Sequence, residues 1–206
     1  MNNKLIVFSG VFYLVGVLGI TLSAYQSFFI GLSFYHLLLS FGVLILGRKK
    51  YTTLYWLYII LAVTVGMLVE WLGVHTGILF GSYHYGNVLG PSLYGVPIII
   101  GLNWALLSIV SVSLFASFKL NFWLEVFLGA AAMVFLDYLM EPVAMKLGFW
   151  QWKGGAVPHY NYLCWFIIAF LLQALYRKWR LNEQNNVAVA LFIYLTCFFT
   201  ILNFSL

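Results

Sequence analysis

The sequence has very few charged residues: only 7% of its 206 residues are Asp, Glu, Lys or Arg, against about a quarter in soluble domains. Because 64% of the residues are hydrophobic, so few charges exclude a water-soluble globular domain. Basic tracts are also lacking despite a net charge of +5, which excludes a nucleic-acid partner. The two cysteines, Cys164 and Cys197, both lie in apolar runs, so neither a disulfide framework nor a cysteine-based zinc site is expected.

In place of charge, the sequence has a series of long apolar runs. A helix that crosses a membrane needs roughly 20 mostly apolar residues. Seven runs approach this length: residues 5–24, 28–46, 54–74, 94–118, 122–143, 162–176 and 187–204. The sequence therefore predicts an all-α, polytopic membrane bundle with about seven transmembrane helices, built as one integral-membrane domain over residues 1–206.

The basic residues are distributed unevenly between the two sides of this predicted bundle. One side would carry Lys4, Arg48, Lys49, Lys50, Lys119, Arg177, Lys178 and Arg180. The other side would carry only Lys146 and Lys153. Because cytoplasmic loops are enriched in Lys and Arg, we expect a cytoplasmic N-terminus and an external C-terminus in a prokaryote-like plasma membrane.

Two loops on the predicted outer side, residues 75–93 and 144–161, resemble each other. Each follows a helix that carries a carboxylate near its end, and each contains two aromatic residues separated by one position. A proline, an asparagine and a tryptophan follow within or after the loop. The corresponding residues are Glu70, Tyr83, Tyr85, Pro97, Asn103 and Trp104 in one unit, and Glu141, Trp150, Trp152, Pro158, Asn161 and Trp165 in the other. This similarity predicts two related helix–loop–helix units.

Three of the five acidic residues lie in the outer halves of predicted helices, where an ionisable group usually faces the protein interior. Asp137 and Glu141 are four residues apart and share a helix face, so one of the two is expected to hold a proton, and the greater depth of Asp137 favours it. Glu70 shares its face with Gly66 and Gly73, which indicates a close-packed interface. We expect all three acids to meet at the outer end of the bundle. The alternative is that each acid only ties helices together by a hydrogen bond.

The histidines give weaker signals. His75, His84 and His159 lie on the outer side near Glu70, but their spacing fits no standard ligand motif, so no metal site is predicted. His36 is expected to form a hydrogen bond between helices. Motifs for nucleotides or prenyl diphosphates are absent, and no cofactor is expected.

A protonated acid in a dry aromatic pocket that opens to lipid suits one type of reaction. It can protonate an isolated carbon–carbon double bond and so form a tertiary carbocation, which Tyr and Trp faces attract. A second carboxylate, with a polar partner such as His84 or Asn161, can then deprotonate water. The net reaction is hydration of the alkene. Ring closure followed by loss of a proton would instead be cyclisation.

A set of motifs in residues 70–165 points to a known family. They are EWLGVHTG (70–77), FGSYHY (80–85), GVP (95–97), NW (103–104), DYLMEP (137–142), GFWQW (148–152) and PHYNY (158–162). In type and order these motifs resemble the carotenoid 1,2-hydratase family of the CruF type. The resemblance implies an integral-membrane hydro-lyase that takes a carotenoid from the bilayer. It would add water to the C1–C2 double bond of an acyclic ψ-end group, on γ-carotene, lycopene or a C50 bacterioruberin precursor.

The leading hypothesis assigns a role to each group of residues. Asp137 donates the proton, and Glu70 or Glu141 acts on water. The predicted substrate-binding residues are Tyr83, Tyr85, Trp104, Trp150, Trp152 and Trp165, and the predicted water-positioning residues are His84, Asn103, His159 and Asn161.

Three alternatives stay open: a membrane cyclase of the lycopene type, a non-catalytic carotenoid-binding protein, and a transporter. Transport is the weakest of them, because the inner halves of the helices are expected to carry almost no buried polar groups.

Overall fold

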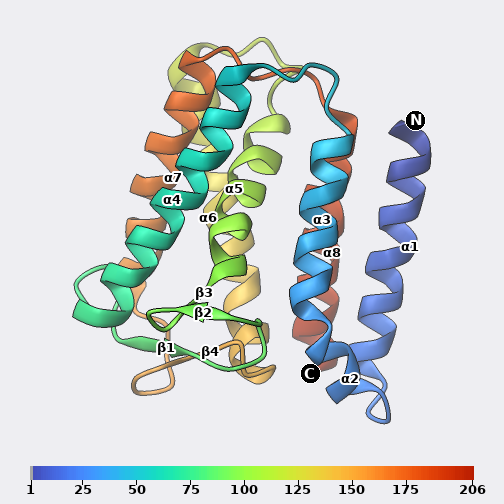
Figure 1. Ribbon diagram of the computed structural model, residues 1–206, viewed down its shortest axis with the longest axis vertical. Helices are drawn as coiled ribbons and strands as arrows, with labels where there is room; N and C mark the ends of the chain where they lie inside the picture. Colours follow the sequence, from blue (N-terminus) through green and yellow to red (C-terminus); the bar gives the residue numbers. More distant parts are fainter. Residues whose placement is uncertain (1) are drawn as a thin grey trace.

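Residues 2–206 are described by a computed structural model and form eight helices and four short strands (Figure 1). The helices are α1 (Asn2–Thr21), α2 (Gln26–Gly31), α3 (Ser33–Leu46), α4 (Thr53–Thr76), α5 (Ile98–Ser113), α6 (Phe122–Lys146), α7 (His159–Lys178) and α8 (Asn186–Ser205). The strands are β1 (Tyr83–Tyr85), β2 (Ser92–Leu93), β3 (Val96–Pro97) and β4 (Trp150–Trp152). Each predicted apolar run overlaps a helix, and the second run overlaps two, α2 and α3. The all-helical prediction is confirmed.

The membrane prediction is supported by four of these helices. By length and composition, α1, α4, α6 and α8 can each cross a membrane, and α3 and α5 are shorter apolar helices. Many large apolar side chains lie exposed on the bundle, as expected for a surface that faces lipid. Seven crossings, and the orientation in the membrane, stay predictions.

Local sequence signals explain where the helices begin and end. Helices α5 and α7 each begin directly after a proline, Pro97 or Pro158, whose fixed φ suits the start of a helix. The side chain of Asn121 accepts a hydrogen bond from the backbone N–H of Leu124 and so caps α6. Helix α4 ends at Gly77, which has a positive φ of 65°.

The helices form two groups that meet at α5 and α6. Helices α4, α5, α6 and α7 pack together, and α1, α3 and α8 lie beside them (Figure 1). Small residues let neighbouring backbones approach: Gly66 of α4 packs on the Trp104 side chain of α5, and Gly129 of α6 packs on Gln173 of α7. The close interface expected on the Glu70 face of α4 is therefore present.

The two aromatic steps that suggested a repeat are paired with each other. Strands β1 and β4 form an antiparallel ladder, with Tyr83 opposite Trp152 and Tyr85 opposite Trp150. The ladder lies at the end of the bundle where α4 and α6 end and α5 and α7 begin (Figure 1). The segments α4–β1–α5 and α6–β4–α7 thus have the same order of parts.

Candidate functional site

The ladder closes a chamber that contains all three outer-half acids. Glu70, Asp137 and Glu141 are buried and line the same cavity. Within residues 2–206, no basic side chain lies within ion-pair distance of them, and the two ion pairs found are at the opposite end of the bundle: Arg48–Glu183 and Arg177–Glu125. The chamber is therefore acidic without a protein cation to neutralise it.

Glu70 is held by three hydrogen-bond donors. The hydroxyls of Tyr83 and Tyr85 both donate to Oε2, the latter at 2.7 Å, and the indole N–H of Trp104 donates to Oε1 at 2.9 Å. Burial, together with the nearby Glu70 carboxyl, raises the pKa of both tyrosines above its usual range. The tyrosines therefore keep their protons and act as donors, and both oxygens of Glu70 are occupied.

Glu141 is held by the second aromatic step. The indole N–H groups of Trp150 and Trp152 donate to Oε2 at 2.8 and 2.7 Å. Alternate residues of a strand point to the same face, so both indoles reach the chamber while Gln151 between them is exposed. The other oxygen, Oε1, has no hydrogen-bond partner within the described chain.

Asp137 has the fewest partners of the three acids. Asn161 on α7 donates from Nδ2 to Asp137 Oδ2 at 3.1 Å, and Oδ1 of Asp137 has no partner among residues 2–206. Asn161 Oδ1 is also buried without a partner. The chamber volume is about 20 Å³, which is room for about one water molecule, and the unpaired oxygens of Asp137 and Glu141 are the polar partners that such a water needs.

Aromatic rings form the rest of the chamber wall. Trp104 and Trp165 stack with their ring centres 4.1 Å apart, and each lies six residues after the first residue of its helix. The ring of Phe80 lies 6.3 Å from both. The six predicted substrate-binding residues all line the chamber: Tyr83, Tyr85, Trp104, Trp150, Trp152 and Trp165. Phe80 was missed, although it belongs to the FGSYHY motif.

The four predicted water-positioning residues divide into two pairs. Asn103 and Asn161 line the chamber. His84 and His159 are exposed and do not line it, so the structure does not support their assignment. His84 lies between the two tyrosines of β1 and therefore points to the opposite face of the strand. His75 is also exposed, and residues 2–206 contain no group of three side chains that could hold a metal ion.

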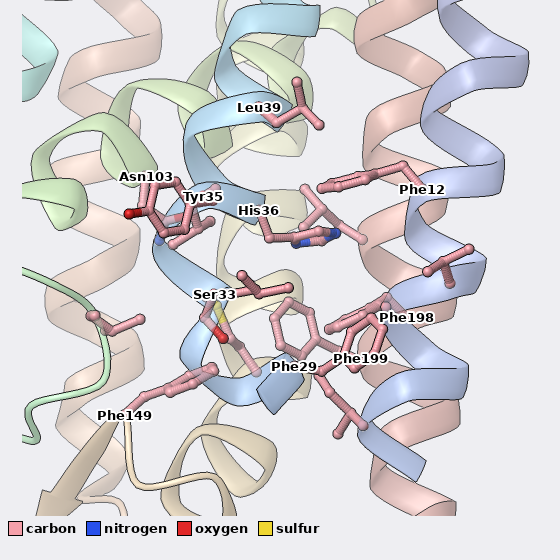
Figure 2. A pocket seen from close by; sticks show the side chains of 18 of the residues that line it. Phe12, Phe29, Ser33, Tyr35, His36, Leu39, Asn103, Phe149, Phe198 and Phe199 are labelled. Carbon is pink, nitrogen blue, oxygen red and sulfur yellow. The ribbon is translucent and has the colours of Figure 1, made fainter. Parts of the chain in front are cut away.

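A larger apolar cavity of about 190 Å³ adjoins the chamber (Figure 2). It lies between α1, α3, α5 and α8, and phenylalanines form much of its wall. Four residues line both spaces: Ile100, Asn103, Met140 and Trp150. The acids are thus next to a space that suits an apolar molecule.

The half of the bundle opposite the acids is more polar inside than expected. Ser108, Ser111 and Gln173 are buried there, and Ser108 is hydrogen-bonded to Tyr58. The expectation that the inner halves carry almost no buried polar groups is therefore wrong. Single serine and glutamine residues within a long apolar run leave the run apolar as a whole, so the sequence pattern does not mark them as buried polar groups. The stacked Trp104 and Trp165 lie between these groups and the acids along α5 and α7, so the described residues show no continuous polar path.

Fold and site together define a helical membrane protein with a buried acidic chamber beside an apolar cavity. The chain belongs to a family described as carotenoid biosynthesis protein, whose family model matches residues 31–206. The match includes all three acids and leaves α1 outside. Searches of curated proteins and of solved structures found no match.

Proposed function

We propose that the protein is a carotenoid hydratase that adds water to the C1–C2 double bond of an acyclic ψ-end group. One observation carries the proposal: Asp137 and Glu141 each present an unpaired oxygen to a space for one water, and this space adjoins an apolar cavity. Hydration needs an acid, a base, one water and an apolar substrate end. Membership of the carotenoid biosynthesis family supports a carotenoid as the substrate.

Asp137 is the proposed proton donor. Its proton moves to C2 of the substrate, the double-bond electrons form the new C–H bond, and C1 becomes a tertiary carbocation. The water then attacks C1, and Glu141 accepts the proton that the water loses. Asp137 and Glu141 lie one helical turn apart on α6, so the proton can return from Glu141 to Asp137 and complete the cycle.

The chamber suits a transient positive charge. No basic side chain of the described chain neutralises the acids, so their negative charge is available to the carbocation. The faces of Trp104, Trp165 and Tyr83 add cation–π attraction, worth about 2 kcal/mol or more when water is excluded. Both contributions are larger in the transition state than in the neutral substrate, as catalysis requires.

The water-sized space favours hydration over cyclisation. A cyclase has to keep water away from its carbocation until a proton is lost, whereas the unpaired oxygens of Asp137 and Glu141 attract water to this chamber. The hydroxylated product differs in mass from its substrate by one water, and a cyclised product does not differ at all.

The test is expression in cells that accumulate lycopene, followed by mass spectrometry of the pigments. Wild-type protein is expected to give the water adduct. Asp137→Asn is expected to lower the yield at least about a hundredfold, as for the loss of a general acid. Glu183→Gln, which removes an acid at the opposite end, is the control and should keep the yield. Full yield from Asp137→Asn, a product of unchanged mass, or unaltered lycopene bound to wild-type protein would each contradict the proposal.

A further inference from the structure

The apolar cavity is enclosed largely by helices and has an opening toward the surface of the bundle. Rings of Phe12, His36 and Phe198 stack against one another on one side of it, with centres 4.3 Å apart for Phe12 and His36 and 5.4 Å apart for His36 and Phe198 (Figure 2). The remaining lining is almost wholly aromatic and aliphatic, which suits an apolar chain. At the other end, Asn103 and Met140 connect the cavity to the acidic chamber.

The opening lies between α1 and α3. Val15 of α1 and Leu39 of α3 both line the cavity, yet 47% of the surface of Val15 and 36% of that of Leu39 are exposed. Both belong to apolar runs, so in a membrane the opening faces lipid. An apolar molecule dissolved in the bilayer reaches the acids by this route without crossing water.

We infer that this cavity binds the isoprenoid chain of the substrate, which enters from the lipid between α1 and α3 and places its end beside the acidic chamber. The inference rests on the proposed function for the identity of the chain. A carotenoid fits better than a saturated lipid chain, because whatever fills the cavity ends beside Asp137 and Glu141, and only an unsaturated end can accept a proton there. The rest of the chain stays in the bilayer.

Helix α1 forms one wall of the cavity, and its side chains limit the size of the molecule that the cavity can hold. It contributes Phe12, Val15, Gly16 and Ile20 to the cavity, and it lies outside the residues matched by the family model. A Cβ atom at position 16 would come within 3.2 Å of the Phe198 ring and 3.7 Å of His36 Nε2. Phe198 and His36 therefore pack close to the backbone of α1 at this level, and a larger side chain at position 16 would take up space in the cavity.

His36 is the one polar group of that aromatic stack. Its Nε2 atom is buried without a hydrogen-bond partner in the described chain, so the expected hydrogen bond between helices is not formed by this atom. The ring instead packs against the rings of Phe12 and Phe198.

Two pairs of variants test the inference by binding alone. Gly16→Leu fills the cavity, and Gly42→Leu is its control because a Cβ at Gly42 meets nothing within 4 Å. Val15→Trp narrows the opening, and Leu14→Trp is its control because Leu14 is exposed and does not line the cavity. All four are made in the Asp137→Asn background, in which the proposed hydration does not remove substrate. The probe is lycopene in lipid nanodiscs, measured as absorbance per protein after washing.

The two plugging variants are expected to retain at most about a tenth of the lycopene held by the parent, and both controls about as much as the parent. Loss in the plugging variants supports the inference even if the wild type proves not to hydrate lycopene, in which case only the proposed function fails. Equal binding in all four variants, or no saturable binding in the parent, would overturn the inference even if hydration is observed. Protein yield and melting temperature check that each variant is folded.

Discussion

At the scale of single residues, the hydrogen bonds separate two kinds of carboxyl group in one chamber. Both oxygens of Glu70 are occupied by donors from β1 and α5, so this residue acts as an acceptor that holds the wall in place. Glu141 and Asp137 each keep one oxygen without a partner. The sequence left open whether Glu70 or Glu141 acts on water, and this difference favours Glu141.

The difference predicts opposite effects for two matched substitutions. In Glu70→Gln the new NH₂ group has to face either the tyrosine hydroxyls or the Trp104 indole, which leaves buried donors unpaired at about 1–3 kcal/mol each. We expect a lower melting temperature. In Glu141→Gln the amide oxygen still accepts both indole N–H groups, so the melting temperature should change little while turnover falls at least about a hundredfold.

Thermal unfolding and product yield, measured on the same preparations, check this pair. If Glu141→Gln keeps its turnover while Glu70→Gln loses turnover without loss of stability, then Glu70 is the residue that acts on water.

At the scale of elements, the site depends on the pairing of two loops that lie far apart in the sequence. The backbone N–H of Gly86 donates to Phe149 O at 2.8 Å, next to the β1–β4 ladder. A Cβ atom at Gly86 would lie 2.1 Å from the backbone oxygen of Gly148. Because that atom belongs to the main chain, it cannot rotate away, so the close approach of the two loops requires glycine here.

We therefore expect Gly86→Ala to separate the loops. The clash should cost about 1–3 kcal/mol of stability and move the Trp150 and Trp152 donors away from Glu141, so that both melting temperature and product yield fall. Gly31→Ala is the control, since a Cβ at Gly31 meets nothing within 4 Å. A Gly86→Ala protein with unchanged melting and full yield would show that the ladder does not position the acids.

The elements also show how far the sequence alone can lead. Long apolar runs predicted the helices, and the four-residue spacing of Asp137 and Glu141 predicted their shared face, because both depend on local periodicity. The failure at His84 has a different origin: three residues of a loop give no sign that they form a strand, and only the strand turns His84 away from the tyrosines. Phe80 was missed because a turn with a φ of 67° at Phe80 itself directs its ring into the chamber.

At the scale of the whole molecule, the acidic chamber and the segments that carry most of the basic residues lie at opposite ends of the bundle. The acids, the ladder and the C-terminus are at one end, and the segments that carry Arg48, Lys119 and Arg177 are at the other, with the N-terminus (Figure 1). The two ends differ in whether their ionisable side chains have partners of opposite charge or hydrogen-bond partners. At the basic end Arg48 donates to Tyr176 and packs on the Tyr55 ring, so that end is closed by paired groups, whereas the acids stay without a cation. The proposed hydration would place the product hydroxyl at the acidic end, near the expected membrane surface, where a hydroxyl is stable.

The uneven distribution of basic residues predicts which end faces the cytoplasm, and labelling can decide it. Lys50 and Lys153 are exposed residues of the basic and the acidic end, respectively. In a protein whose native Cys164 and Cys197 are changed to serine, a membrane-impermeant maleimide should label Lys153→Cys in intact cells, and Lys50→Cys only after the cells are opened. Labelling of Lys50→Cys alone in intact cells would place the acidic chamber toward the cytoplasm. Equal labelling of both positions in intact cells would contradict the three crossings expected between these residues, by α4, α5 and α6, because an odd number of crossings places the two residues on opposite sides.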